Sequence, residues 1–152
     1  AVRFEGATGI GSHIANCSIH NGWGWAFHAT ASSNIKVEGT IMFKFIAFGA
    51  VATSVSNFTM DGNIVAHTTE RDIDSQNFAR GMIAICSRPE ENKCSGLKIT
   101  NNIAAGGAYA GFVMPASNCG DDSKYRDNVA HSIDGYKGGV GAVIFPDPSE
   151  PA

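Results

Sequence analysis

The residues best suited to binding or catalysis lie in a charged segment between His67 and Gly81. Glu70, Arg71 and Asp72 bring both signs of charge together in a chain in which only 16% of residues are charged. Together with His67, they could hold a carboxylated sugar or a calcium ion. Loops longer than about 12 residues on a rigid scaffold often carry function. The same charges could instead pair with one another as a solvated excursion, and both interpretations stay open.

A second candidate is a pair of carboxylates, Glu38 and Asp61, which occupy the same position in two successive copies of a repeat. Glycoside hydrolysis uses two carboxyl groups about 5 to 9.5 Å apart, and stacking on neighbouring coils would give such a distance. Both residues also precede a glycine at an expected corner, where polar side chains are common. The equivalent position in the next copy is Thr100, which adds no acid. We therefore expect solvated corner residues and assign no catalytic residue.

The histidines and cysteines lack the spacing of a metal site. No Cys-x-x-Cys pair is present, and no histidine lies at zinc-finger spacing. His67 and His131 would lie about two coils apart, beyond the reach of one zinc ion. His13 and His28 are expected to be isolated surface or corner residues. We predict no metal site and no cofactor.

The two tryptophans, Trp23 and Trp25, are separated by one glycine, so a strand would place both indoles on one face. Facing outward, they would form a platform for sugar rings, and facing inward, they would fill the end of a core. Their alternation with Phe27 favours the inward orientation.

The element that must position these residues is a repeated phrase, with copies that begin at Asn34, Asn57 and Gly96. Within each copy apolar and polar residues alternate, which indicates a half-buried strand, and a pair rich in Gly, Asn or Asp follows at a sharp corner. The steps between equivalent positions are 23, 23, 39 and 26, counted along Cys17, Thr40, Asn63, Asn102 and Asn128. This period predicts an all-β fold, a right-handed parallel β-helix of about five to six coils.

Stacked coils should align apolar side chains into one internal ladder: Ile14, Val37, Met60, Ile99 and Tyr125. The longest step exceeds its neighbours, and we assign its extra residues to one side insertion at about 67–81. The alternative is an antiparallel sandwich with coincidental spacing.

Composition is consistent with a solenoid and excludes some partners. The chain has 152 residues, 43% hydrophobic, with 18 glycines and a net charge of −3. The acidic balance and the absence of a dense basic run argue against nucleic-acid binding. No apolar run approaches the roughly 18 residues of a membrane span, so we expect membrane contact only through parts outside this segment. The pattern shows no capping helix, so we expect residues 1–152 to be one β-helix segment of a larger multidomain protein.

The cysteines and the glycosylation sequons indicate an oxidising compartment. Cys119 follows Cys94 by about one coil, so we prefer a disulfide between them, with Cys86–Cys94 as the alternative. All four cysteines could instead be buried thiols. Asn16 and Asn57 begin Asn-x-Ser/Thr sequons at expected corners, where an N-linked glycan would face solvent. We expect an extracellular or cell-surface location.

Several phrases, in order, resemble one known group: Asn21–His28, Asp61–His67, Asn101–Gly106, Gly111–Pro115 and Asn128–Ser132. Together they resemble the parallel β-helix repeat region of fibrocystin and fibrocystin-L, and more distantly the related hyaluronan-processing proteins that also carry G8 domains. The resemblance covers most of the chain, from about Ile14 to Pro148. It implies a very large extracellular glycoprotein, membrane-anchored or secreted, on a cilium or another specialised cell surface. It supplies no catalytic motif.

These observations favour a structural or recognition segment that is not a catalyst. Its expected partners are extracellular glycans or other surface glycoproteins, and not nucleic acid. Two alternatives remain open. One is a polysaccharide-processing domain, hyaluronidase-like or lyase-like, that uses the face near His67, Glu70, Arg71 and Asp72. The other is a glycan-binding module built on the same segment.

Overall fold

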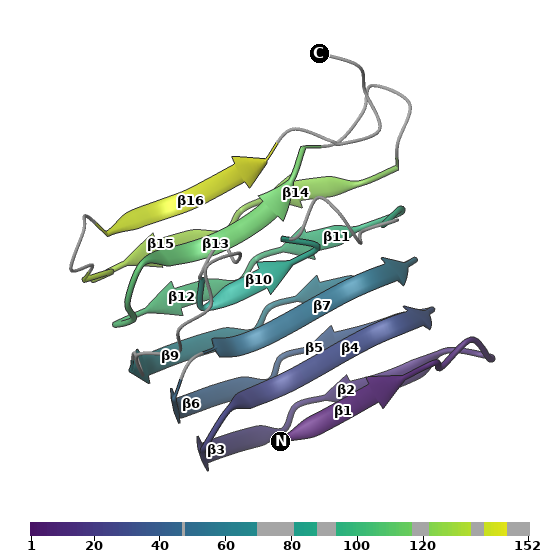
Figure 1. Cartoon of the computed structure of the whole chain (residues 1–152), viewed down its shortest axis with the longest axis horizontal. Coiled ribbons are helices and arrows are strands. Elements are labelled where there is room, and N and C mark those ends of the chain that lie inside the picture. Colours follow the sequence, from purple (N-terminus) through teal and green to yellow (C-terminus); the bar gives the residue numbers. More distant parts are fainter. Residues whose placement is uncertain (47, 70–80, 88–93, 117–121, 135–138, 146–152) are drawn as a thin grey trace.

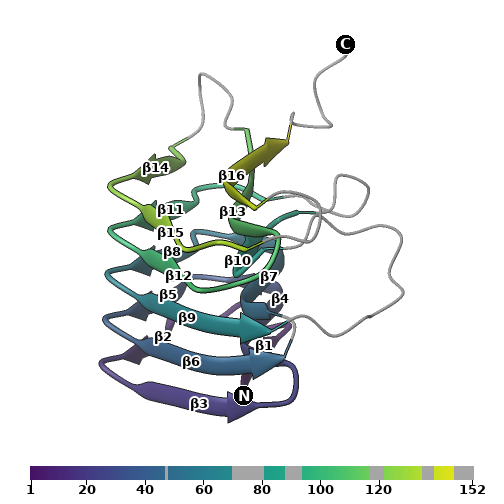
Figure 2. The ribbon, with the colours of Figure 1, turned by 90° about the vertical axis from the view of Figure 1, so that its left-hand side faces the viewer.

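The chain folds as a parallel β-helix. The computed structural model describes residues 1–46, 48–69, 81–87, 94–116, 122–134 and 139–145, in which the regular elements are β-strands. The strands pass in cyclic order through three parallel sheets of six, five and five strands, so each coil adds one strand to each sheet (Figures 1 and 2). These numbers match the five to six coils expected from the repeat, and the predicted all-β solenoid is confirmed.

We name the sheets A, B and C in the order in which the chain meets them. Sheet A contains β1 (Val2–Glu5), β4 (Trp25–Ser33), β7 (Phe48–Ser56), β10 (Ile83–Ile85), β13 (Ala110–Pro115) and β16 (Val140–Phe145). Sheet B contains β2 (Ser12–Ala15), β5 (Ile35–Glu38), β8 (Thr59–Asp61), β11 (Lys98–Thr100) and β14 (Lys124–Arg126). Sheet C contains β3 (Ser18–Gly22), β6 (Ile41–Ile46), β9 (Ile64–Thr69), β12 (Ile103–Ala105) and β15 (Val129–His131).

The inner side chains of sheet B form the predicted ladder. Its members align strand by strand in the register of the sheet: Ile14, Val37, Met60, Ile99 and Tyr125. The three central members are fully buried, and the two at the ends are partly buried against the same core. Because parallel strands lie about 4.8 Å apart, like side chains stack in contact and exclude water along the axis.

The corners between sheets B and C need a left-handed backbone conformation. Gly39, Gly62 and Asn101 occupy this position with φ values of 53°, 63° and 57°. Glycine adopts such a φ at little cost, and asparagine tolerates it better than most residues. The Gly/Asn pairs that mark the repeat are therefore explained by backbone geometry.

The residue after each of these corners belongs to a stack of side chains in the interior, which we call the asparagine ladder: Thr40, Asn63, Asn102 and Asn128. The first three are fully buried, and Asn128 is partly buried. The Asn63 Oδ1 accepts the backbone N–H of Thr40, and the Asn102 Oδ1 accepts the backbone N–H of Asn63. The Asn128 Oδ1 in turn accepts the N–H of Asn102. Each asparagine thus satisfies a backbone donor of the coil beneath it.

The same side chains also satisfy backbone acceptors. The Nδ2 groups of Asn63, Asn102 and Asn128 donate to main-chain carbonyls of the preceding coil, at distances of 2.9, 2.9 and 2.7 Å. Asn63 and Asn102, moreover, donate to the Oδ1 of the next asparagine in the ladder. A buried amide is stable only when its polar atoms are paired, and here the coils above and below provide the partners.

The extra residues of the longest step form two excursions and not one. Ala50 aligns with Phe27 on the preceding coil at the ordinary step of the repeat, whereas it aligns with Ile83 on the next coil at a longer step. Met60 aligns with Ile99 at a step that is longer still. The chain therefore gains residues before β10 and again after it. The first excursion is the one expected at about 67–81; the second lies between Ile85 and Ser95, and the sequence did not reveal it.

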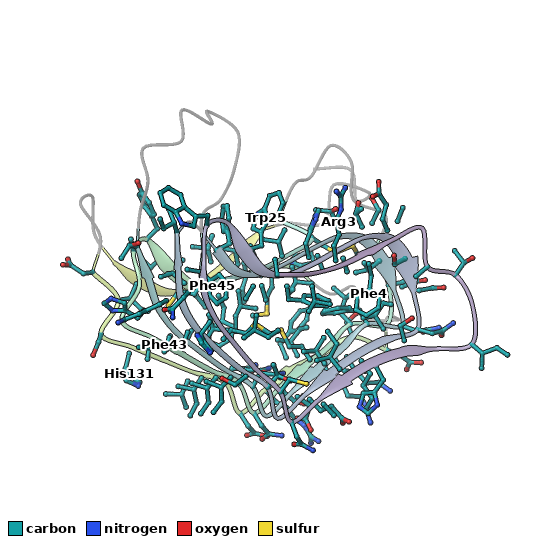
Figure 3. The ribbon with its side chains drawn as sticks, turned by 90° about the horizontal axis from the view of Figure 1, so that it is seen from below. Arg3, Phe4, Trp25, Phe43, Phe45 and His131 are labelled. Carbon is teal, nitrogen blue, oxygen red and sulfur yellow. A yellow bond between two sulfur atoms is a disulfide. The ribbon has the colours of Figure 1, made fainter. Side chains whose placement is uncertain are left out.

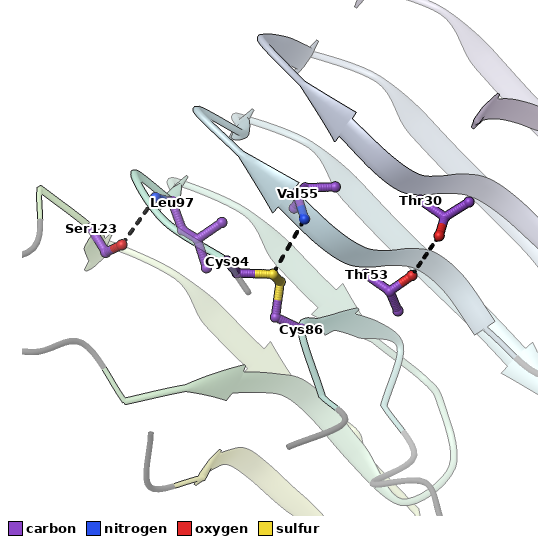
Figure 4. The surroundings of a disulfide bond; sticks show 7 residues. All are labelled: Thr30, Thr53, Val55, Cys86, Cys94, Leu97 and Ser123. Carbon is purple, nitrogen blue, oxygen red and sulfur yellow. Dashed lines mark hydrogen bonds between the residues drawn. A yellow bond between two sulfur atoms is a disulfide. The ribbon is translucent and has the colours of Figure 1, made fainter. Parts of the chain in front are cut away.

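A disulfide joins the two ends of the second excursion (Figure 4). The Cys86 N–H donates to the Ala52 carbonyl, and the Val55 N–H donates to the Cys94 Sγ, so both cysteines lie against β7. Their Cα atoms are 6.5 Å apart.

The preferred pairing of Cys94 with Cys119 is therefore wrong, and the alternative, Cys86–Cys94, is correct. Spacing by one coil favoured Cys119 as the partner of Cys94. It did not show that the second excursion returns Cys94 beside Cys86 on the same coil. Cys119 lies outside the described residues, and Cys17 is an exposed free thiol.

We predict that Asn102→Ala lowers the free energy of unfolding by about 3 kcal/mol or more, since it leaves the buried N–H of Asn63 and the Met60 carbonyl without partners. Urea unfolding followed by circular dichroism measures the change. The neighbouring Asn101→Gly is the control, because its φ of 57° suits glycine and it loses only an exposed hydrogen bond to Asp61. Equal losses in the two variants would contradict the structural role of the asparagine ladder.

We also predict that Cys86→Ser with Cys94→Ser costs about 2 to 3 kcal/mol, because the disulfide closes a short loop in the unfolded chain. Peptide mapping without reduction should recover one cross-linked peptide that contains both residues. Recovery of Cys94 linked to Cys119 would contradict this connectivity.

Candidate functional site

The outer surface of sheet A carries an aromatic and polar patch across β1, β4 and β7. We call it the tryptophan face, and it consists of Arg3, Glu5, Trp25, His28, Thr30 and Thr53. Arg3 aligns with His28, and Glu5 aligns with Thr30, which aligns with Thr53. Trp25 and Arg3 lie on the same outer side of the ribbon, whereas Phe4 and Phe45 point into it (Figure 3).

The centre of the tryptophan face is an aromatic pair. The ring centroids of Trp25 and His28 are 4.6 Å apart, with 33° between the ring planes. Burial lowers the pKa of His28, and the Arg3 guanidinium lowers it further, while Glu5 opposes them weakly. The imidazole is therefore neutral at neutral pH, and it packs against the indole on the same strand. Trp25 keeps 41% of its surface exposed, so it presents a held aromatic surface to solvent.

Polar groups surround this aromatic pair. The Arg3 guanidinium and the Glu5 carboxylate form an ion pair at 3.0 Å, with both side chains more than half exposed. The Thr53 hydroxyl donates to the Thr30 hydroxyl at 3.0 Å. The His28 Nδ1 is buried and has no hydrogen-bond partner in the described part of the protein. An aromatic surface flanked by a few hydrogen-bonding groups can stack against the apolar face of a sugar ring and bind its hydroxyls.

The predicted burial of the tryptophans is wrong. Trp23 is 81% exposed and Trp25 is 41% exposed. β3 ends at Gly22 and β4 begins at Trp25, so the two indoles do not alternate along one strand. The inner space at this level is filled by Phe27 and Phe45, both fully buried. The Phe45 ring lies so close to Gly22 that a Cβ there would be 2.2 Å from it, so Phe45 occupies the space that a side chain at position 22 would need.

The sequence did not single out Arg3 or His28, and it classed His28 as an isolated surface residue. The feature that would have revealed them is the number of residues between aligned positions on β1 and β4, which places Arg3 beside His28 and Glu5 beside Thr30. That offset is slightly longer than the ordinary step of the repeat, so the alignment of the phrase did not reach it.

The candidate ligand group of the charged segment is only partly described. His67 is exposed on β9 with a φ of 57°, and its ring lies 5.9 Å from that of Phe43 on sheet C. Glu70, Arg71 and Asp72 lie outside the described residues. A ligand role for these four residues stays a prediction.

The carboxylates Glu38 and Asp61 are stacked as expected, in register on β5 and β8. A hydrogen bond from Lys36, at 2.7 Å from the carboxylate, lowers the pKa of Glu38. Hydrogen bonds from Thr100 and Asn101 likewise lower the pKa of Asp61. Both groups are therefore ionised at neutral pH, whereas a glycosidase needs one of its two carboxyl groups protonated. The pair is therefore poorly suited to glycoside hydrolysis, and its side chains are solvated at the corner of the coil.

Both sequon asparagines lie at corners, Asn16 with a φ of 52° and Asn57 with a φ of 49°. Their glycosylation stays a prediction. Within the described ranges, no group of three His, Cys, Asp or Glu side chains could hold a metal ion. The described part of the chain also contains no helix long and apolar enough to cross a membrane.

The geometry defines a parallel β-helix with an aromatic and polar patch on one outer face. No protein-family model, curated protein or solved structure matches this chain. The resemblance to the fibrocystin repeat region therefore rests on the sequence phrases alone.

We predict that the stability of the protein falls more steeply with acid in the wild type than in Asp61→Asn. The folded pKa of Asp61 is depressed, so its stabilising contribution is complete above the unfolded value of 3.8 and is lost as the pH falls through the folded value. Urea midpoints measured between about pH 5 and pH 2 test this. Thr100→Ala removes the main cause of the depression and should give an intermediate slope. Identical slopes in all three proteins would contradict the assignment.

Proposed function

We propose that this chain is a structural and recognition segment of a large extracellular or cell-surface glycoprotein, that it is not a catalyst, and that it binds glycans through the tryptophan face. The observation that carries the binding role is the exposed Trp25 ring held against a neutral His28, with Arg3 and Glu5 beside it. Tryptophan offers a large amphipathic surface, and burying it against a sugar releases ordered water.

The scaffold supports this proposal by being rigid. β4 and β7 are each nine residues long, and they pair in register over most of their length. Side chains on such strands need little reordering when a ligand arrives, so less of the binding energy is lost to conformational entropy.

The disulfide supports the extracellular location. Disulfides persist in oxidising compartments and are rare in the cytosol. The corner asparagines of both sequons can accept a glycan without disturbing the sheets, because neither side chain is part of the core. The resemblance to the fibrocystin group points to the same compartment, including a ciliary surface.

The test is a screen of neutral glycans against the oxidised chain, followed by calorimetry of the best ligand. We expect Trp25→Ala to weaken binding by about fivefold or more, since stacking on an aromatic ring contributes roughly 1 kcal/mol beyond area burial. Phe43→Ala is the matched control, because Phe43 is 40% exposed but lies on sheet C.

Equal affinity of wild type and Trp25→Ala for every ligand found would overturn the proposed site. Cleavage of a polysaccharide during the same assay would favour the polysaccharide-processing alternative. The triple replacement of Glu70, Arg71 and Asp72 by alanine would then show whether the charged segment is responsible.

A further inference from the structure

The outer surface of sheet B carries a row of basic and polar residues. In register order the row contains His13, Lys36, Thr59, Lys98 and Lys124. Two residues further along each strand, a second outward-facing row contains Glu38, Asp61, Thr100 and Arg126 in the same register. The strands β5 and β8 each carry a carboxylate. The strands β11 and β14, at the upper left of Figure 2, carry cations and no carboxylate.

The two halves of this surface differ in charge balance. On β5, Lys36 pairs with Glu38 at 2.7 Å, and His13 approaches the same carboxylate at 3.2 Å. Arg126 pairs only loosely with Asp127, at 3.8 Å. In the described part of the chain, neither Lys98 nor Lys124 has a carboxylate within ion-pair distance. We call Lys98, Lys124 and Arg126 the basic ladder; all three are exposed.

Lys98 and Lys124 lie directly opposite each other on neighbouring parallel strands. Such positions are about 4.8 Å apart, and like charges directly opposite destabilise a sheet. The chain contains more acidic than basic residues, with a net charge of −3. Three cations nevertheless lie together on this surface. An anion laid along the axis would neutralise the repulsion and gain charge-assisted hydrogen bonds.

We propose that the basic ladder binds a sulfated linear polysaccharide, whose charges repeat along its length as the cations repeat along the helix axis. The hydroxyl of Thr59 borders the ladder and can donate to sulfate or sugar oxygens, whereas the Thr100 hydroxyl already donates to Asp61. The sheet B positions in register with the ladder carry no tryptophan or phenylalanine for base stacking, which favours a polysaccharide over single-stranded nucleic acid. The inference shares the extracellular location proposed above but uses a different face and a different ligand class.

The test measures the affinity of the oxidised chain for a heparin oligosaccharide at several salt concentrations. We expect binding that weakens with salt, and an affinity about tenfold or more lower in Lys98→Gln with Lys124→Gln. Loss of two cation contacts should also make the plot of log affinity against log salt shallower by roughly two. The single variants Lys98→Gln and Lys124→Gln are compared with Lys44→Gln, which removes the same charge from sheet C and should bind as the wild type does.

Three outcomes would overturn the inference. They are no binding of heparin by the wild type at low salt, an equal loss in Lys44→Gln, and tighter binding of single-stranded DNA or phosphatidylserine vesicles than of heparin. Unsulfated hyaluronan serves as the carboxylate-only arm and should bind more weakly.

The double variant is also expected to have a higher thermal midpoint than the wild type in the absence of ligand, because the opposed charges are gone. A lower midpoint would contradict the repulsion argument. Trp25→Ala should bind heparin as the wild type does, so failure of the tryptophan face and failure of the basic ladder are distinguishable.

Discussion

The hydrogen bonds of the asparagine ladder are the constraint on which the other features depend. At the corner between sheets B and C, Thr40, Asn63 and Asn102 lie outside the strands, so their N–H groups need partners other than those of a regular strand ladder. A side-chain oxygen from the coil above accepts each of them, and the amide nitrogens return a bond to the coil below. A slip of a single position would break several of these bonds at once and would turn the apolar ladder of Val37, Met60 and Ile99 toward solvent.

A fixed register also sets what each outer face presents. On sheet A, it places Arg3 beside His28, whose ring packs against that of Trp25. On sheet B, it places Lys98 opposite Lys124. The two faces therefore differ in chemistry although one winding pattern produces both. Excursions can be added before and after β10 without disturbing either face, because the chain returns to the register that the corner dictates.

Sequence alone located the corners, the inner ladder of sheet B and the stacking of Glu38 on Asp61, because all of these follow the repeated phrase. It failed where the step changes. The step from Met60 to Ile99 gives only the total number of extra residues, so it does not reveal that some of them lie between Cys86 and Cys94. The disulfide was therefore assigned to the wrong pair. Trp25 was placed in the core because alternation was assumed to cross Gly24, where the strand is interrupted. Arg3 and His28 were missed because the offset between them is not that of the repeat.

Amide hydrogen exchange followed by NMR tests the role of the asparagine ladder most directly. The backbone N–H groups of Asn63 and Asn102 are bonded to side-chain oxygens, so their protection reports on the ladder itself. We predict that both exchange only through global unfolding, with an opening free energy equal to that of the whole protein. Exchange as fast as that of exposed corner amides, in an otherwise folded protein, would contradict the account.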